Sequence, residues 1–279
     1  MQKVLVLGNT GKMGNAIEHS LKSTYLVSGK NRDNFDAMNL DSVKAIIDSE
    51  SPDYVINTVA FMGIDPCEIE PDKAIKINTL YPKFLAELSN ERKFTLIHFS
   101  TDSVFSGRKK GFYVESDVPD PINIYGLTKY GGDCFIQAIA NKYYILRLSV
   151  LFGKSSSEQF VEKMLIKLKN GESLKIADDI VSSPTYSLDV ADRLLEIIKS
   201  KYPYGLYHTI NFGQASLYEL MQEIVKTLAI RSIVAKGSYR DFPYVGNKNL
   251  FTPLISEKLP PLRDWKDAIK DYCESLNNV

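Results

Sequence analysis

The first half of the chain alternates short apolar runs with longer amphipathic stretches. Hydrophobic residues occupy both the odd and the even positions of each run, which is typical of strands covered on both faces of a parallel sheet. The strands predicted in this way are 3–7, 25–29, 54–59, 94–99 and 143–150.

The stretches between these runs carry apolar residues at the spacing of one helix face. They predict helices over 11–23, 40–50, 71–91 and 128–142. Strand–helix alternation of this kind implies right-handed crossovers between parallel strands. We therefore predict an α/β fold with a doubly wound parallel sheet, a Rossmann domain, over residues 1–150.

The alternation loosens after residue 150. Amphipathic patterns predict helices over 157–171, 187–201 and 217–230, and a final helix from about Asp264. No repeat or low-complexity linker separates the two halves. We expect residues 151–279 to form mainly a smaller C-terminal lobe packed on the sheet, with 151–215 as the segment that could add strands to it.

Composition and charge restrict the classes of partner. Hydrophobic residues make up 44% and charged residues 24%, as in an ordinary globular domain. The 34 basic and 34 acidic side chains cancel, so the chain lacks the basic surface that nucleic-acid binding needs. No apolar run reaches the length of a membrane span, and the first residues are too short and Gly-rich for a signal peptide. We expect a cytoplasmic protein with neither partner.

The cysteines and histidines predict no metal site. Cys67, Cys134 and Cys273 are scattered without a CxxC pair, and the 3 histidines share no ligand spacing. An odd, scattered set of thiols argues against disulfides and zinc and for a reducing compartment. Cys134 and Met164 are expected to fill the core, and Trp265 to pack in the final helix.

A glycine pattern follows the first predicted strand. Gly8, Gly11 and Gly14 form G-x-x-G-x-x-G at the start of the first helix. Glycines allow a tight turn and close backbone approach to a diphosphate, and the helix N-terminus supplies free N–H groups. In this strand–turn–helix context the pattern predicts dinucleotide binding, while a sharp βα turn without a ligand is the alternative.

The end of the second strand bears on the choice of cofactor. NAD-selective sites carry an acidic residue there, which accepts bonds from the ribose hydroxyls. Lys30 and Arg32 lie close to that position and would suit a 2′-phosphate. The sequence therefore favours NADP, with NAD as the alternative if Asp33 points inward.

Tyr125 and Lys129 are four residues apart, which places both on one face of a helix. The spacing alone is weak because the chain has 16 tyrosines. The fourth strand ends in Ser100, Thr101 and Asp102, and ligands of parallel sheets bind beyond the carboxyl ends of strands. A hydroxyl from Thr101 would therefore meet the Tyr–Lys pair above a bound nicotinamide.

Taken together, these motifs resemble the extended short-chain dehydrogenase/reductases, and more closely the dTDP-4-dehydrorhamnose reductase family of sugar-nucleotide enzymes. The resemblance covers most of the chain, and the combination of S-T-D, V-F-x-G and P-x-N-x-Y-G-x-T-K is specific to this group. The matching segments are 8–14, 57–71, 76–82, 100–107, 120–133, 145–149, 182–186 and 205–220.

The resemblance implies an NAD(P)H-dependent reductase that transfers hydride to the ketone of a nucleotide-linked 4-keto-6-deoxy sugar. Tyr125 would donate the proton, and the Lys129 ammonium would lower the pKa of Tyr125 and bind the nicotinamide ribose. Thr101 would hydrogen-bond the substrate oxygen. Asn78 matches a bracing asparagine, with a structural cap as an equal alternative.

The predicted sites follow from the motifs and the resemblance together. The cofactor site comprises Gly8, Thr10, Gly11, Met13, Gly14, Lys30, Arg32, Asn39, Leu40, Ala60, Asn78, Tyr125 and Lys129. The C-terminal lobe would bind the substrate, and substrate contacts are expected from Asp102, Ser103, Val150, Pro184 and Thr185. For the segment 182–186, a loop ordered by proline is an equal alternative.

Several positions depart from the family pattern. Val150 stands where an aromatic residue often packs on the sugar, Ser103 where Tyr is common, and Phe61 where His is frequent. The usual C-terminal Arg-Pro is missing, which leaves Arg240, Lys248 and Asn249 as candidates for diphosphate contacts. The cofactor machinery therefore matches better than the sugar pocket, whose substrate the sequence leaves open.

Two alternatives remain at this point. One is an epimerase or dehydratase of the same fold, although the Glu that dehydratases usually carry after Thr-Asp is Ser103 here. The other is a regulatory subunit that binds NADP(H) and a protein partner without turnover. Loss of the Tyr–Lys pair would have favoured the latter, and both residues are present. A homodimer is the default expectation for such enzymes.

Overall fold

A computed structural model describes residues 1–154 and 159–277. Its centre is a 6-stranded, fully parallel sheet in the order β10-β5-β4-β3-β1-β2. The strands are β1 (Lys3–Leu7), β2 (Leu26–Lys30), β3 (Tyr54–Asn57), β4 (Thr95–Thr101), β5 (Tyr143–Leu148) and β10 (Gly205–His208). The predicted doubly wound sheet is confirmed, and its sixth strand comes from within 151–215.

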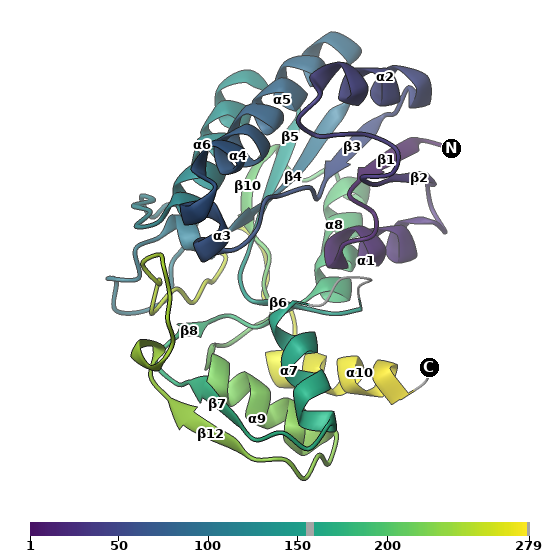
Figure 1. Ribbon diagram of the computed structural model, residues 1–279. Coiled ribbons are helices and arrows are strands. Elements are labelled where there is room, and N and C mark those ends of the chain that lie inside the picture. The colour runs from purple at the N-terminus through teal and green to yellow at the C-terminus, as the bar shows by residue number, and fades with distance from the viewer. Residues whose placement is uncertain (155–158, 278–279) are drawn as a thin grey trace.

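Helices cover both faces of this sheet (Figure 1). On one face, α1 (Lys12–Leu21) and α8 (Ser187–Lys199) pack side by side against apolar residues of β1, β4 and β5. On the other face lie α2 (Leu40–Glu50), α5 (Tyr81–Arg92) and α6 (Ile124–Ile139). Alternate residues of β1 enter the two cores, since Val4 and Val6 face α1 while Leu5 and Leu7 face α2.

Two helices and one strand differ from the sequence predictions. The helix predicted over 71–91 is divided into α4 (Pro71–Ile75), a wide π-helical turn η1 (Lys76–Leu80) and α5. Helix α6 begins at Ile124 instead of residue 128, because the Asn123 side chain caps it by accepting a bond from Gly126 N at 2.8 Å. Strand β2 lies at the sheet edge and is only half-buried, with Leu26 exposed, instead of covered on both faces.

The C-terminal lobe has a hydrophobic core of its own and lies beyond the carboxyl edge of the sheet (Figure 1). Its helices are α7 (Phe160–Lys169), α9 (Leu217–Thr227) and α10 (Trp265–Asn277). Its strand pairs are β6 (Leu151–Phe152) with β9 (Thr185–Tyr186), β7 (Leu174–Ala177) with β12 (Val234–Gly237), and β8 (Val181–Ser182) with β11 (Ala215–Ser216). Of the helix predicted over 157–171, residues 157–158 lie outside the described part of the chain.

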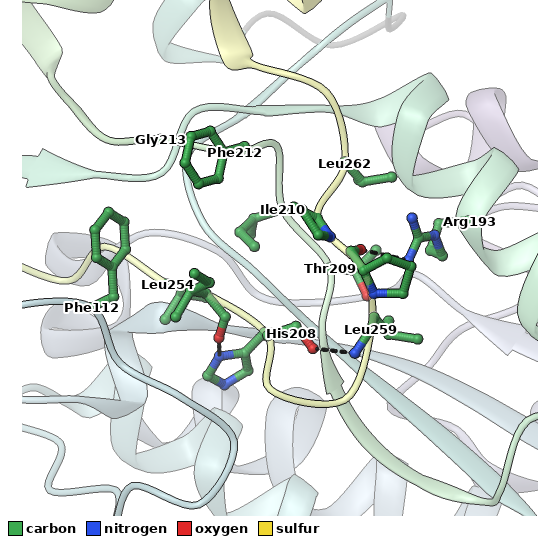
Figure 2. Close-up of a pocket in the computed structure, with 14 residues that line it drawn as sticks. Phe112, Arg193, His208, Thr209, Ile210, Phe212, Gly213, Leu254, Leu259 and Leu262 are labelled. Atoms are coloured by element: carbon green, nitrogen blue, oxygen red, sulfur yellow. Dashed lines mark hydrogen bonds between the residues drawn. The ribbon is translucent and has the colours of Figure 1, made fainter.

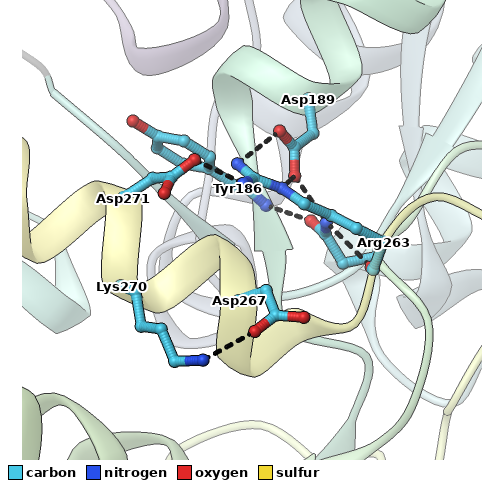
Figure 3. Close-up of polar contacts among 7 residues, drawn as sticks. Tyr186, Asp189, Arg263, Asp267, Lys270 and Asp271 are labelled. Atoms are coloured by element: carbon cyan, nitrogen blue, oxygen red, sulfur yellow. Dashed lines mark hydrogen bonds and ion pairs between the residues drawn. The ribbon is translucent and has the colours of Figure 1, made fainter.

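An ion-pair cluster fastens this lobe to the sheet domain. Figure 3 shows the Arg263 guanidinium between Asp189, at the start of α8, and Asp271 of α10. Arg263 Nη2 lies 2.8 Å from Asp189 Oδ1, and a second bond joins Arg263 Nε to Asp189 Oδ2 at 2.9 Å. This paired geometry fixes direction as well as distance, so the last helix is held in register with α8.

The remaining short elements connect these layers. They are α3 (Ile64–Ile69) and the turns η2 (Asp102–Val104) and η3 (Tyr239–Asp241). In the described part of the chain, no helix combines the length and the apolar character needed to cross a bilayer.

Three side chains were predicted to have packing roles only. Trp265 is buried in the core of the lobe and Met164 packs against it, so both predictions are confirmed. Cys134 is exposed, so the prediction that it fills the core is wrong. It follows Asp133 on α6, and the helical turn that buries Asp133 directs the next residue away from the sheet.

A buried ion pair ties α6 to the sheet. Asp133 and Arg147 of β5 expose 0% and 2% of their side chains, and Arg147 Nη2 lies 3.2 Å from Asp133 Oδ2. The same carboxylate oxygen accepts a bond of 2.6 Å from Ser100 Oγ at the end of β4. Helix α6 is thus attached to two neighbouring strands at once.

This arrangement predicts a large loss of stability in Arg147→Ala. The substitution leaves the Asp133 carboxylate buried without its counter-ion, which costs about 3–5 kcal/mol of the free energy of unfolding. Urea unfolding at neutral pH measures the loss as a lower midpoint with an unchanged slope. The matched control is Arg92→Ala, which removes an exposed pair with Asp48 and is expected to leave the midpoint unchanged. Equal shifts in both variants would contradict the buried-pair argument.

Candidate active site

A cleft of about 850 Å³ opens at the carboxyl edge of the sheet, between the sheet domain and the C-terminal lobe. It lies at the switch point where β1 has β2 on one side and β3 on the other, the place where doubly wound sheets bind ligands. The predicted site residues that line it are Gly11, Met13, Ala60, Thr101, Tyr125 and Lys129. The sequence missed Lys12, Thr58, Met62, Ser149, Leu151 and Gln159, which also line it.

The glycine loop forms the floor of the cleft beside β1. Gly8 N donates to the Lys30 carbonyl at 2.7 Å, and Gly11 caps the start of α1. A Cβ added at Gly14 would lie 2.4 Å from the Gly8 carbonyl oxygen, so only glycine permits this turn. The N-terminus of α1 is therefore directed at the cleft, with a backbone close enough to contact a diphosphate.

Lys12 is a functional candidate that the sequence did not indicate. It is the first residue of α1 and is 2% exposed, yet it carries a charge. Its Nζ lies 2.7 Å from Glu162 Oε2 and donates to Gln159 Oε1 at 2.9 Å, and both partners belong to the start of α7. This ion pair joins the glycine loop to the C-terminal lobe across the cleft. Only the folding of the lobe brings these residues together, so no local pattern could reveal it.

The residues predicted to select the cofactor lie outside the walls of this cleft. Lys30 Nζ pairs with Glu50 Oε1 at 2.7 Å, while Arg32 and Asp33 are both exposed. Asn39 caps α2 by accepting a bond of 3.1 Å from Ser42 N. Leu40, the first residue of α2, is exposed. Arg32 is thus the cation of this segment that is better placed to meet a ligand from solvent.

Thr101 and Tyr125 line the cleft together. Thr101 Oγ1 donates to Asp102 Oδ1 at 3.1 Å and accepts from Ser103 N at 3.2 Å. Burial raises the pKa of the Tyr125 phenol above its ordinary value, while a hydrogen bond with Thr101 acts in the opposite sense. The net shift is upward, contrary to the expected lowering by Lys129. Tyr125 is consequently a protonated phenol throughout the neutral range.

Lys129 lies one helical turn after Tyr125 on α6 and is 2% exposed. Its Nζ donates to the Phe99 carbonyl at 2.6 Å and lies 3.1 Å from His98 Nε2. Burial lowers the pKa of Lys129 to about 8, and the Asp133 charge opposes this change.

Asn78 braces the cleft from the π-helical turn η1. Its Oδ1 accepts from Phe61 N at 2.9 Å, and its Nδ2 donates to Phe61 O at 2.9 Å and to Thr128 Oγ1 at 3.2 Å. A Cβ added at Gly132 would lie 2.4 Å from the Asn78 carbonyl oxygen, so a glycine on α6 permits this close approach. Asn78 thus joins the segment after β3 to α6, and π-helical turns are frequent at such sites.

Asp102 lies behind Thr101 and is almost fully buried. Its carboxylate accepts bonds of 2.7 Å each from Ser149 Oγ and Thr252 Oγ1, in addition to the bond from Thr101. Burial raises its pKa, and these three hydroxyls oppose the change. Asp102 therefore positions hydroxyl groups from three segments and lies outside the set that lines the cleft.

The structure does not bring the other predicted substrate contacts to the cleft walls. Val150 packs against the core of the lobe, while its neighbours Ser149 and Leu151 line the cleft. Pro184 and Thr185 are buried, and Thr185 Oγ1 donates to the Ser183 carbonyl at 2.9 Å. Ser103 is half-buried against Gly126 at the start of α6. Their contact with a substrate stays a prediction.

A second cavity, of about 360 Å³, lies at the end of β10 and is mostly apolar (Figure 2). His208 is buried beside it, and His208 Nδ1 is 3.1 Å from the Ile255 carbonyl oxygen. Burial and the Arg147 charge lower the pKa of His208 to about 4. This cavity contains none of the glycine loop, Tyr125 or Lys129, so it is not the site that the sequence predicts.

A third, open cavity, of about 930 Å³, lies beside the start of α6. Arg108, Arg240 and Lys248 line it together with aromatic residues, and Lys248 Nζ lies 3.9 Å from the centre of the Tyr244 ring. Asn123, the cap of α6, donates to Asn249 Oδ1 at 2.8 Å. Asn249 is buried and donates to the Phe105 carbonyl at 2.6 Å, which makes it a support of this cavity's wall.

Comparisons with known proteins agree with this geometry. The family model described as "RmlD substrate binding domain" matches residues 1–278. The spore coat polysaccharide biosynthesis protein SpsK of Bacillus subtilis is 32% identical over 284 residues, covering 100% of this chain and 99% of that protein. The dTDP-4-dehydrorhamnose reductase of Aggregatibacter actinomycetemcomitans is 30% identical, covering 97% and 98%. The structure of dTDP-4-dehydrorhamnose reductase from Bacillus anthracis in complex with NADP matches with a TM-score of 0.93 and 27% identity, covering 98% and 99%.

The buried histidines predict a specific acid dependence of stability. Burial lowers the pKa of His98 and of His208, so below about pH 6.5 the unfolded chain binds protons that the folded chain does not. The contribution of these two neutral histidines to the free energy of unfolding is therefore complete above pH 6.5 and is lost as the pH falls. Between pH 7 and pH 5 we expect a loss of about 2 kcal/mol per buried histidine in the free energy of unfolding.

Urea unfolding at the two pH values measures this loss. In His208→Gln the loss is expected to fall by about half, whereas His19→Gln, at an exposed position of α1, leaves it unchanged. An undiminished loss in His208→Gln would contradict the assignment.

Proposed function

Because this chain belongs to the family of the RmlD substrate binding domain, we propose that it is a reductase of a nucleotide-linked 4-keto-6-deoxy sugar, of the dTDP-4-dehydrorhamnose reductase type. It is an NAD(P)-dependent oxidoreductase of the extended short-chain type. The observation that carries the proposal is the meeting of Thr101, Tyr125 and Lys129 with the glycine loop in one cleft. Relatives named dTDP-4-dehydrorhamnose reductase and dTDP-4-keto-6-deoxy-D-glucose reductase support it.

The cofactor is NADP(H), as in the related reductase solved in complex with NADP. The cleft fits a dinucleotide because Gly14 leaves the space that a side chain would fill and the N-terminus of α1 faces it. When bound, NADPH supplies the hydride. Arg32, exposed at the end of β2, is the proposed contact of the 2′-phosphate. Lys30 pairs with Glu50 and would serve mainly to shape that segment.

Tyr125 is the proposed proton donor. Its raised pKa keeps the phenol protonated at neutral pH, which is the form that a reduction consumes when the ketone oxygen becomes an alkoxide. The Thr101 hydroxyl lines the same cleft and would donate a hydrogen bond to that oxygen. Asp102 accepts the bonds that hold Thr101 and Ser149 in place. The phenol is thus an acid, and its neighbours orient the substrate oxygen.

The nucleotide part of the substrate is proposed to occupy the open cavity beside α6. Arg108 and Arg240 supply cations for a diphosphate, whereas Lys248 Nζ pairs with Asp65 Oδ1 at 3.2 Å. Tyr239 and Phe242 supply ring faces for a base. The segment 247–252 joins this cavity to the catalytic cleft, since Thr252 bonds Asp102 and Asn249 bonds the cap residue Asn123. Deoxysugar and polysaccharide biosynthesis is the proposed setting. A cytoplasmic location and a homodimer stay predictions.

Replacement of Tyr125 by Phe tests the reductase. With NADPH and a panel of dTDP-, UDP-, GDP- and CDP-linked 4-keto-6-deoxy sugars, each with and without a 3,5-epimerase, we expect oxidation of NADPH by the unchanged protein. Tyr125→Phe should lower kcat by about 100-fold or more, because it removes the proton donor. Tyr130→Phe, one position after Lys129 on the same helix, is the matched control and should retain activity.

The melting temperature separates the alternative outcomes of this assay. NADPH is expected to raise it equally in both variants. A cofactor-induced rise without oxidation of NADPH by any sugar would contradict the reductase and favour an epimerase or a regulatory subunit.

Substitution in the open cavity tests the nucleotide site separately. Arg240→Ala removes a cation from this cavity, and we expect KM for the nucleotide sugar to rise about tenfold, with kcat unchanged, because the lost contact is equal in ground and transition states. Arg231→Ala, an exposed arginine of the same lobe outside the cavity, should leave KM unchanged. An unchanged KM in Arg240→Ala would place the diphosphate elsewhere.

A further inference from the structure

Three buried side chains form a hydrogen-bonded row that ends at the cleft, namely Asn57, His98 and Lys129. Asn57 of β3 and His98 of β4 are register partners in the sheet, and both are 1% exposed. Asn57 Nδ2 lies 3.1 Å from His98 Nδ1, and His98 Nε2 lies 3.1 Å from Lys129 Nζ. This row thus runs from the sheet interior to the cleft, which Lys129 lines.

The orientation of the Asn57 amide is determined by a backbone bond. Its Oδ1 accepts from Val59 N at 3.0 Å, so its Nδ2 is the group that faces His98. Rotating the amide by half a turn would set the NH₂ group against the Val59 N–H, donor against donor. Because an unsatisfied buried donor costs about 1–3 kcal/mol, the observed orientation is the stable one.

This orientation determines where the proton of His98 is. Asn57 Nδ2 is a donor only, so His98 Nδ1 must accept and therefore carries no proton. A neutral imidazole then has its proton on Nε2, which donates toward Lys129 Nζ. An ammonium has three donors and no acceptor, and it would oppose this Nε2–H. A neutral amine has a lone pair for it, and it still donates to the Phe99 carbonyl.

We propose that Asn57 and His98 are positioning residues that hold Lys129 as a neutral amine in the cofactor-free enzyme. They act by presenting an Nε2–H donor where the ammonium would need an acceptor. Protonation of Lys129 then requires His98 to change tautomer against Asn57, or Nζ to leave His98 for acceptor oxygens in the cleft.

The charges around Lys129 agree with this assignment. Asp133, one turn further along α6, favours the ammonium, but its carboxylate is already bonded to Ser100 and Arg147. Burial, opposed by the Asp133 charge, lowers the pKa of Lys129 to about 8, which by itself leaves most of the lysine charged at pH 7. The tautomer constraint acts in the same direction, because it penalises only the charged form.

Asp102 of η2 and Cys67 of α3 act on Tyr125, one turn before Lys129, and Glu68 of α3 accepts a bond of 2.9 Å from Ile124 N at the start of the helix. Asp102 raises the pKa of Tyr125, as does Cys67. Burial raises the pKa of Cys67 itself to about 11, so its thiol is neutral at working pH. Burial lowers the pKa of His98, and an ammonium at Lys129 would lower it further, so the imidazole is neutral for either form of Lys129.

The consequence for function rests on the proposed reductase. Ribose hydroxyls of a cofactor in the cleft would accept hydrogen bonds from Lys129 Nζ, which His98 cannot do while Nε2 carries a proton. Lys129 would then take up a proton when NADP(H) binds, and the affinity for the cofactor would fall as the pH rises above neutral. Binding of NADP(H) would therefore convert Lys129 to an ammonium.

The tautomer of His98 can be measured directly in the cofactor-free enzyme. The chain has 3 histidines, so a ¹⁵N-histidine spectrum that separates protonated from bare ring nitrogens is readable. We expect His98 to show a bare Nδ1 and a protonated Nε2 at pH 9, above the pKa of Lys129. A proton on Nδ1 would overturn the proposal, whatever reaction the enzyme catalyses.

His19→Gln identifies the exposed histidine in this spectrum. His208 is identified by its contact with the Phe105 ring, whose centre lies 6.0 Å away. His98 is then assigned by elimination, without any variant at a buried position.

A second measurement follows the charge of Lys129 itself. With lysine labelled at ¹³Cε and Lys129→Met for assignment, the Lys129 signal is titrated against pH. Asn57→Leu removes the amide that fixes the tautomer, and we expect the midpoint to rise by about one pH unit, because one buried donor–donor opposition disappears. Asn90→Leu, which removes a half-buried amide bonded to the Ile139 carbonyl, should leave the midpoint unchanged.

An unchanged midpoint in a folded Asn57→Leu, or a wild-type midpoint as high as that of exposed lysines, would overturn the proposal. If Asn57→Leu does not fold, the ¹⁵N spectrum of the unchanged protein decides. Proton release in place of uptake, measured by calorimetry of NADP⁺ binding in buffers of different ionisation enthalpy, would contradict the functional consequence alone.

Discussion

The position of helix α6 depends on one buried carboxylate. Asp133 bonds Ser100 at the end of β4 and Arg147 on β5, and nothing but a second polar group could compensate its burial. Tyr125 and Lys129 lie two turns and one turn before it, respectively, on the same helix. Their position over the carboxyl edge of the sheet is therefore set by an ion pair whose two residues are not among those that line the cleft. Asn78 and Gly132 hold the other side of the helix at a separation that no larger residue permits.

Burial also determines the chemistry of the residues that this helix presents. It raises the pKa of Tyr125 and lowers that of Lys129, so it shifts both side chains toward their neutral forms. A neutral phenol is ready to give up a proton, and a neutral amine avoids an unpaired charge inside the protein. The familiar description, in which a permanent ammonium lowers the pKa of the tyrosine, needs a ligand that hydrates or pairs the lysine. In the protein without ligand the buried polar groups hydrogen-bond one another, and His98 and Asn57 belong to the set that includes Lys129.

Much of this could be predicted from the sequence because the signals were local. The apolar run 3–7 followed by Gly8, Gly11 and Gly14 requires only its own residues to form a strand and a turn. The pairing of Tyr125 with Lys129 required only the helical period. The π-helical turn at Asn78 was not predictable, since an unbroken helical pattern covers it. The bonds of Lys12 to Glu162 and of Lys30 to Glu50 join residues far apart in the chain. The exposure of Cys134 depended on which face of α6 the Asp133 pair turned inward.

The two halves of the chain contribute different parts of the site. The proton donor and its supports belong to strands and helices of the sheet domain, where a shift of one side chain would disturb several buried bonds. Leu151 and Gln159 reach the same cleft from the lobe, which has its own core and is joined to the sheet domain by specific contacts such as those of Lys12 and Arg263. Residues of the lobe can change the shape of the substrate pocket while Asp133, Arg147 and Asn78 stay as they are. The lobe can therefore determine which sugar fits, and the sheet domain determines that the sugar is reduced.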